Sequence, residues 1–171
     1  MSVGVDSGDL DAVARQLGRA PRGVLAIAAR VADGAPAVIA TAPRLPDGTP
    51  FPTFYYLTHP ALVAAMSRLE AAGRMRDYEA MLADPGTAAA YEAAHRQYLA
   101  ARAAAGDVPE IAGVSAGGMP SRVKCLHALG GHALAAGPGV NPIGDRALAD
   151  AAAADPVVAA LLRPRFVNPS V

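Results

Sequence analysis

The chain changes character at Leu57-Thr58-His59-Pro60, and this change indicates a fold in which the strands precede most of the helices in the sequence. Before this point, three short aliphatic or aromatic stretches are separated by turn signals. After it, apolar residues recur at helical spacing and prolines mark new helix starts. Strands followed by helices are typical of an α+β domain. We therefore expect an α+β domain in which a small N-terminal antiparallel sheet packs against four or five helices.

The expected sheet has about three strands, at residues 24–31, 37–42 and 54–57. Asp33-Gly34 lies between the first two strands and is a strong hairpin signal. Asp47-Gly48, followed by two prolines, marks a second turn before the third strand. Consecutive strands joined by such turns predict an antiparallel meander.

Helices are expected near residues 9–17, 60–72, 77–83, 85–105, 121–136 and 145–154. Asp9 is the expected cap of the first helix, and Asp145 of the last. The helix at 121–136 contains Gly130 and Gly131, and each glycine costs roughly 1 kcal/mol relative to alanine. This helix must therefore either meet a close neighbour at the glycine pair or be kinked there.

The length of 171 residues fits one domain, which we expect at residues 9–163, with a disordered leader at 1–8 and a tail at 164–171.

Lys plus Arg equals Asp plus Glu, at 15 each, which argues against nucleic-acid binding through bulk basicity. No apolar run approaches the roughly 18 residues of a membrane span. The single cysteine excludes an intrachain disulfide and suits a reducing compartment. A cytoplasmic location is expected.

The densest group of chemically active side chains contains Cys125, His127 and His132. Thiolate and imidazole are the usual zinc ligands. On one continuous helix Cys125 and His132 share a face, and His127 joins them only if the helix begins at or after Cys125 or bends at the glycine pair. His59, at the strand-to-helix junction, is a fourth ligand candidate. These four residues predict a Zn²⁺ site; alternatively, Cys125 is a small buried apolar residue and the histidines are packed or solvated.

A glycine-rich loop precedes this group and contains Gly117 and Gly118, with Arg122 and Lys124 shortly after them. Backbone N–H groups at the start of a helix, together with basic side chains, bind phosphate or carboxylate groups. The pattern predicts a small anionic or phosphorylated ligand at these four residues. An equally open alternative is a surface loop in which the glycines only make the turn.

Two further patterns bear on catalysis. His95 follows Glu92 by three residues on the long expected helix, so Glu92 can orient the imidazole, and the two are candidates for acid–base catalysis beside a metal. Alternatively, His95 is hydrogen-bonded in the core.

Residues 113–117 also match the G-x-S-x-G pattern of serine hydrolases, with Ser115 as nucleophile. This motif requires a strand before the serine and a helix after it, and neither is expected here. A serine hydrolase is therefore kept only as a third hypothesis, behind the two functions given below.

Several motifs together resemble an uncharacterised, mainly actinobacterial family known as domain of unknown function five-zero-one, over about residues 10–148. The motifs are Pro21-Arg22-Gly23, Pro50-Phe51-Pro52-Thr53, Leu57-Thr58-His59-Pro60, Val123-Lys124-Cys125-Leu126-His127 with His132, and Asn141-Pro142-Ile143-Gly144. The resemblance implies that relatives carry Cys or His at the position of His59. An exchange of this kind suits a zinc ligand better than a general base.

The resemblance carries no established activity. It does imply a genomic setting, because genes of the family often lie near those for enolase, a septum-formation initiator and an exopolyphosphatase. Two hypotheses follow. The first is a cytosolic zinc-binding protein, hydrolytic if a coordination position stays open. The alternative is a non-catalytic partner-binding or regulatory module linked to cell division or phosphate metabolism.

Overall fold

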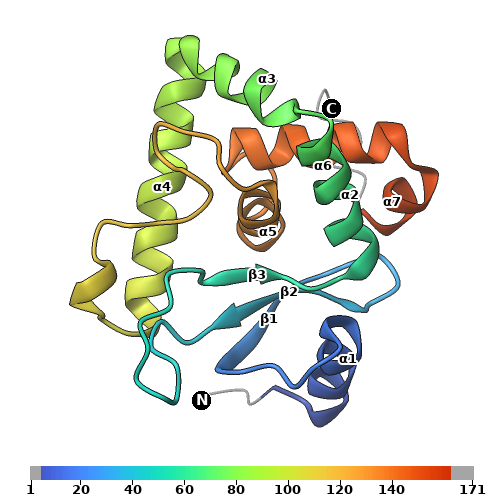
Figure 1. Ribbon diagram of the computed structural model, residues 1–171, viewed down its shortest axis with the longest axis vertical. Helices are drawn as coiled ribbons and strands as arrows, with labels where there is room; N and C mark the ends of the chain where they lie inside the picture. The colour runs from blue at the N-terminus through green and yellow to red at the C-terminus, as the bar shows by residue number, and fades with distance from the viewer. Residues whose placement is uncertain (1–4, 163–171) are drawn as a thin grey trace.

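The computed structural model describes residues 5–162 and shows an antiparallel sheet packed with helices (Figure 1), which confirms the α+β class. The strands are β1 (Val24–Arg30), β2 (Pro36–Thr41) and β3 (Tyr55–Leu57). The α-helices are α1 (Ser7–Leu17), α2 (Pro60–Ala71), α3 (Arg74–Ala80), α4 (Pro85–Ala105), α5 (Leu126–Ala136), α6 (Pro142–Ala154) and α7 (Pro156–Leu161). Two 3-10 turns are η1 (Met81–Ala83) and η2 (Pro109–Ile111). The described residues thus form seven α-helices, against six helical segments expected along the chain and four or five expected to pack against the sheet.

The sheet has the order β1-β2-β3, and both pairs of neighbouring strands are antiparallel. The predicted hairpin at Asp33-Gly34 is present, and Gly34 has the positive φ of 90° that such a turn requires. The central strand β2 is buried along its whole length. Val38 and Ala40 face the main core, whereas Ile39 faces the opposite side of the sheet. Both faces of the sheet are therefore covered.

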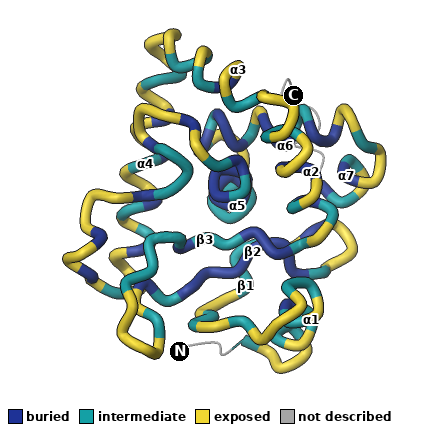
Figure 2. The backbone as a smooth tube through the Cα atoms, viewed as in Figure 1, coloured by how far each residue is buried: buried dark blue, intermediate teal, exposed yellow. Residues whose placement is uncertain are grey.

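Helix α5 runs through the middle of the helical layer, and Figure 2 shows it largely buried. A Cβ atom added at Gly130 would lie 3.2 Å from the sulfur of Met66 in α2. One added at Gly131 would lie 3.4 Å from the Tyr55 carbonyl in β3. Gly130 therefore lets α5 approach α2 closely, which is the first of the two explanations expected for the glycine pair, whereas a Cβ at Gly131 would be in ordinary contact with β3.

The start of α5 differs from the prediction. The expected helix began near Ser121, but α5 begins at Leu126, and Cys125 is extended, with φ −150° and ψ 108°. Long-range contacts decide this boundary, because the backbone amides of Val123 and Leu126 are both bound by carboxylates from distant helices.

Two helix caps also differ from the prediction. Asp6, not Asp9, caps α1 by accepting a hydrogen bond of 2.7 Å from Gly8, and Asp9 instead pairs with Arg30 at 2.6 Å. Asn141, not Asp145, caps α6. Helix α1 therefore starts two residues before the expected start and α6 three residues before it, each directly after a side chain that accepts a capping hydrogen bond.

The predicted ends of the domain are only partly described. Residues 7 and 8, assigned to the leader, belong to α1, while residues 1–4 and the predicted tail lie outside the described part of the chain. Within the described part, none of the helices has the length and apolar character that crossing a bilayer requires.

Candidate metal centre

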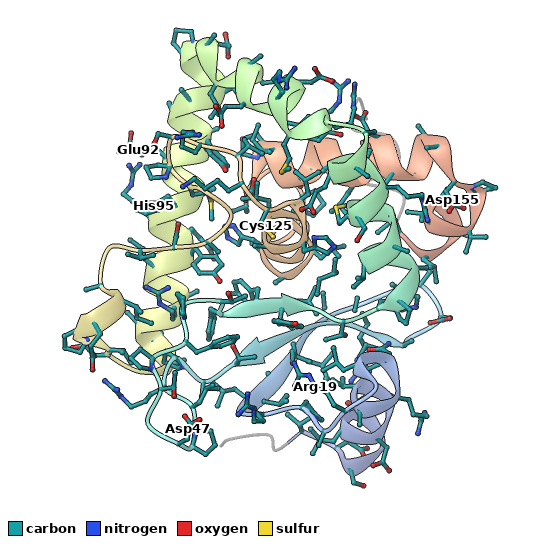
Figure 3. The ribbon with its side chains drawn as sticks, viewed as in Figure 1. Arg19, Asp47, Glu92, His95, Cys125 and Asp155 are labelled. Carbon is teal, nitrogen blue, oxygen red and sulfur yellow. The ribbon has the colours of Figure 1, made fainter. Side chains whose placement is uncertain are left out.

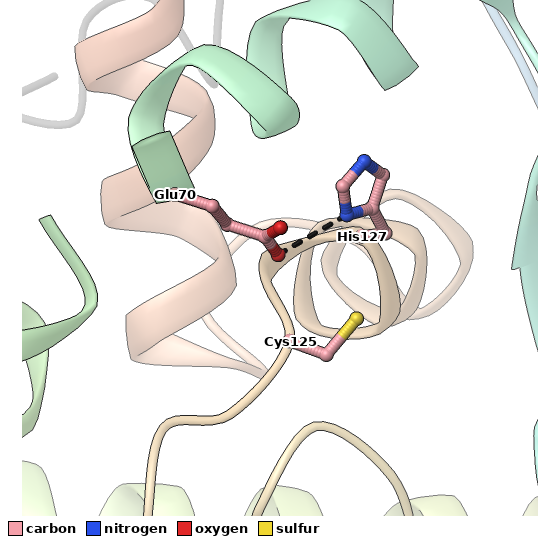
Figure 4. Close-up of side chains that lie close together, drawn as sticks. All are labelled: Glu70, Cys125 and His127. Carbon is pink, nitrogen blue, oxygen red and sulfur yellow. Dashed lines mark hydrogen bonds and ion pairs between the residues drawn. The ribbon is translucent and has the colours of Figure 1, made fainter. Parts of the chain in front are cut away.

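Three side chains that can bind a metal meet at the start of α5: Glu70, Cys125 and His127 (Figure 4). One ligand atom from each lies within 4.8 Å of the others, and all three residues are partly buried. Glu70 comes from the last turn of α2, Cys125 is the N-cap residue of α5, and His127 lies in the first turn of α5. Among the described residues this is the one such group.

The carboxylate of Glu70 holds the group together. Its Oε1 atom accepts a hydrogen bond of 2.8 Å from the backbone N–H of Leu126 and lies 3.1 Å from Nδ1 of His127. The first N–H groups of a helix have no partner within the helix and favour negative charge. Glu70 therefore caps α5 from another helix and places its charge beside the imidazole.

The helix boundary explains why Cys125 and His127 can share a site. Two residues that are two positions apart point in nearly opposite directions within a helix. Because Cys125 is extended and the helix starts only after it, this restriction does not apply. The condition set by the sequence, a helix that begins at or after Cys125, is met.

The second ring nitrogen of His127 faces α2. Nε2 lies 3.2 Å from the carbonyl oxygen of Val63 and 3.1 Å from the hydroxyl of Ser67. A carbonyl only accepts hydrogen bonds, so this contact places a proton on Nε2. Histidines that bind metals usually donate their remaining ring N–H to such a partner. Nδ1 is then the candidate ligand atom, and it faces Glu70.

The charges of Cys125 and His127 support each other. Interaction with the Cys125 side chain, and secondly with Glu70, raises the pKa of His127 to about 9, although burial acts in the opposite direction. Interaction with His127 lowers the pKa of the Cys125 thiol, again against burial. Each partner therefore favours the charged form of the other, the thiolate of Cys125 and the imidazolium of His127. The thiolate is the form of cysteine that binds metals.

A hollow of about 270 Å³ adjoins the group and is lined by Cys125 and His127 together with β3 and α2. Its other walls are mostly apolar and include Leu57 and Val63. Apart from Cys125 and His127, no ionisable side chain other than tyrosine lines it within the described part of the chain. A molecule bound there can reach the thiol and the imidazole directly.

The other two predicted ligands lie elsewhere, so the four residues do not form one site. His132 is fully buried, and its ring nitrogens bond to Gln97 at 2.6 Å and to Asn141 at 3.1 Å. His59 is the N-cap residue of α2, and its Nδ1 has no hydrogen-bond partner among the described residues. Cys125 lies outside α5 as its N-cap residue, so the alignment expected for Cys125 and His132 on one helix does not apply.

Sequence reasoning missed Glu70, although one weak signal pointed to it. An acidic side chain in the last turn of a helix opposes the helix dipole, which favours cations there. Glu70 occupies such a position in α2. Its partner Leu126 is 56 residues away in the sequence, so the sequence alone does not indicate which group Glu70 binds.

The predicted anion-binding loop folds tightly on itself. A Cβ atom at Gly117 would lie 2.6 Å from Leu129, and one at Gly118 would lie 2.6 Å from the Arg122 carbonyl, so both positions require glycine. Arg122 also pairs with Glu79 at 3.4 Å.

The Glu79 carboxylate accepts a hydrogen bond of 2.9 Å from the Val123 amide as well. A carboxylate of the protein itself thus occupies part of the predicted site. Lys124 is exposed. Binding of an external anion at these residues stays a prediction.

His95 and Glu92 do not join the metal group (Figure 3). Nδ1 of His95 lies 2.8 Å from the hydroxyl of Ser115, which is only 5 % exposed. Burial lowers the pKa of His95. Glu92 pairs with Arg96 on the exposed side of α4. His95 is thus tied to the glycine-rich loop rather than to the metal group.

Ser115 does not occupy the strand-to-helix turn that a nucleophilic serine of this motif requires. The 3-10 turn η2 and an irregular segment precede it, and turns follow it. The contact with His95 brings together two groups found in serine hydrolases. No carboxylate is hydrogen-bonded to His95 within the described part of the chain.

Comparison with known proteins identifies one family. No curated protein and no solved structure gives a significant match. A family described as "Protein of unknown function (DUF501)" matches residues 27–149. This range includes β1 from residue 27 onward, all of β2 and β3, and all three residues of the metal group, and it covers well over half of the chain. The chain therefore belongs to the DUF501 family.

Proposed function

We propose that this protein binds Zn²⁺ through Glu70, Cys125 and His127. The observation that carries the proposal is the close approach of the three side chains. One ligand atom from each lies within 4.8 Å of the others, and Glu70 Oε1 lies 3.1 Å from His127 Nδ1. Zinc bonds of about 2.0–2.3 Å in a tetrahedron place ligand atoms about 3–4 Å apart. Small side-chain movements therefore suffice to bring the three ligands onto one ion.

The ligand types favour zinc over the harder cations. Mg²⁺ and Ca²⁺ are bound by oxygen atoms, whereas Cys125 offers a soft thiolate and His127 an imidazole. The Val63 carbonyl supplies the outer hydrogen bond that fixes the orientation of a zinc-bound histidine.

Three protein ligands leave one position of the tetrahedron open, as in catalytic zinc sites. The hollow lined by Cys125 and His127 gives that position room for water or a small ligand. Zinc lowers the pKa of a bound water towards neutrality, which is the basis of zinc-dependent hydrolysis. A hydrolytic role stays a prediction, because His95 and Glu92 lie outside the group.

The test is titration of untagged, chelator-treated protein with Zn²⁺ and Co²⁺. We expect about one equivalent to bind, a thiolate-to-Co²⁺ absorption band and a rise in melting temperature. Cys125→Ser should abolish the band, and Glu70→Gln should weaken binding. His59→Asn is the matched control and should bind normally, because His59 lies outside the group.

Absence of both the Co²⁺ band and a zinc-dependent melting shift would contradict the proposal. Loss of binding in His59→Asn would instead support the four-ligand set predicted from the sequence. A protein indifferent to metal would favour the alternative of a non-catalytic partner-binding module.

A further inference from the structure

The face of the sheet opposite α5 carries a second hollow, of about 150 Å³. Ile39 of β2 and Tyr56 of β3 contribute to its floor, where they lie directly opposite each other across the strands. Leu17 at the end of α1 closes one side, and Leu45 and Phe51 close another. The hollow is thus lined mainly by apolar side chains, two of them aromatic. None of the three residues of the metal group lines it, although Tyr56 also lines the hollow beside that group.

The wall that contains Leu45 and Phe51 is held in place by hydrogen bonds. The Leu45 amide bonds to the Thr49 carbonyl at 2.9 Å, and the Phe51 amide bonds to the Pro43 carbonyl at 2.8 Å. Arg44 of the same loop forms two hydrogen bonds of 2.8 Å with the carboxylate of Glu110. A preformed wall lowers the entropic cost of binding a ligand.

Two guanidinium groups line the same hollow, from Arg19 and Arg22, and no acidic side chain of the described residues does. The side chain of Arg19 makes only a 3.5 Å contact with the Ala20 carbonyl and forms no ion pair within the described part of the chain. Arg22 reaches Asp47 at 3.9 Å, and both side chains are more than half exposed. Figure 3 shows Arg19 beside α1, on the side of the sheet away from α5. Most of the positive charge of these two guanidinium groups is therefore available to a ligand in the hollow.

We propose that this hollow binds a small molecule with one flat apolar ring and an anionic group, such as a phosphate or carboxylate. A cavity of about 150 Å³ lined by apolar side chains is large enough for a benzene ring. Phe51 and Tyr56 offer aromatic surfaces to such a ring. Guanidinium groups bind carboxylates and phosphates through paired hydrogen bonds, so Arg19 and Arg22 fix the anionic end.

Phenyl phosphate is the probe, with phenol and inorganic phosphate as its separate halves. Calorimetry on the full chain in chelator should show saturable binding of phenyl phosphate, tighter than that of either half. Perturbed NMR signals should include the methyl groups of Leu17, Ile39 and Leu45. Replacement of both Arg19 and Arg22 by Gln should weaken binding by about tenfold or more, while the exposed Arg76→Gln serves as the matched control.

Equal binding by the double variant, or NMR changes confined to other residues, would overturn the proposal. Binding of inorganic phosphate as tight as that of phenyl phosphate would also overturn it, because the ring would then contribute nothing. The Cys125→Ser variant should bind the probe normally, so the outcome is independent of the metal group. Melting curves of the variants should match the parent, because both arginines are exposed.

Discussion

The Glu70 carboxylate accepts a 2.8 Å hydrogen bond from the backbone amide of Leu126, so a side chain from α2 caps the first turn of α5. The same oxygen lies 3.1 Å from the imidazole of His127. Glu70 therefore has two tasks, since it stabilises the most buried helix of the domain and adjusts the charge of a proposed zinc ligand. Substitutions at this position should change both properties together.

Glu70→Gln should lower both the stability of the fold and the pKa of His127. The amide keeps the size of the side chain but removes the negative charge from the helix start, which should cost about 1 kcal/mol in unfolding free energy. The pKa of His127 should fall from about 9. Urea unfolding and NMR titration of the ring in chelator measure the two effects. Glu92→Gln, which removes an exposed ion pair, should change the stability by at most about 0.5 kcal/mol.

Zinc affinity should rise with pH up to about pH 9. Binding at Nδ1 of His127 displaces a proton whose pKa is raised to about 9, so each pH unit below that value should weaken binding about tenfold. Competition with a chromophoric chelator between about pH 7 and 9 measures this slope. An affinity independent of pH over this range would show that His127 is not a ligand.

His132 should make the protein sensitive to mild acid. Burial lowers its pKa to about 4, whereas an imidazole in the unfolded chain titrates near 6.5. The pKa of His132 is lower in the folded protein than in the unfolded chain. The neutral ring of His132 therefore contributes its full share of the unfolding free energy above pH 6.5, and this share declines as the pH falls towards 4. The expected loss of unfolding free energy is roughly 3 kcal/mol.

The hydrogen bonds of His132 also favour the neutral ring and so support a lowered pKa. Asn141 donates from Nδ2 to Nδ1 of the ring, and a proton on Nδ1 would place two donors against each other. Unfolding free energies measured across this pH range should fall less steeply in His132→Gln, which cannot titrate. Equal slopes in the two proteins would rule out His132 as the source.

Gly144→Ala should destabilise the domain by about 1–3 kcal/mol through overpacking. A Cβ atom there would clash with the backbone carbonyl of Leu129 and lie 2.7 Å from the Cβ of Ala133, because α6 packs directly on α5. Thermal and urea unfolding measure the loss. Gly131→Ala is the matched control, because its Cβ would have no neighbour closer than 3.4 Å, and its stability should change little.

The sequence by itself determined the class of fold and most element positions. Asp33-Gly34 produced the predicted hairpin, and Pro60 and Pro85 begin α2 and α4 as expected. These signals act over a few residues, because proline lacks an N–H group and glycine tolerates positive φ. They therefore operate in the same way whatever the rest of the chain does.

Only the tertiary structure decided which residues share a site. Cys125 and His127 come together because α5 starts at Leu126. At that boundary the Leu126 amide is bound by Glu70, 56 residues away, and the Val123 amide by Glu79, 44 residues away. His132, two turns of helix away from Cys125 in the sequence prediction, instead binds Gln97 and Asn141 in the core. Contacts between distant segments depend on how helices pack, and helix packing leaves no local pattern in the sequence from which its partners can be deduced.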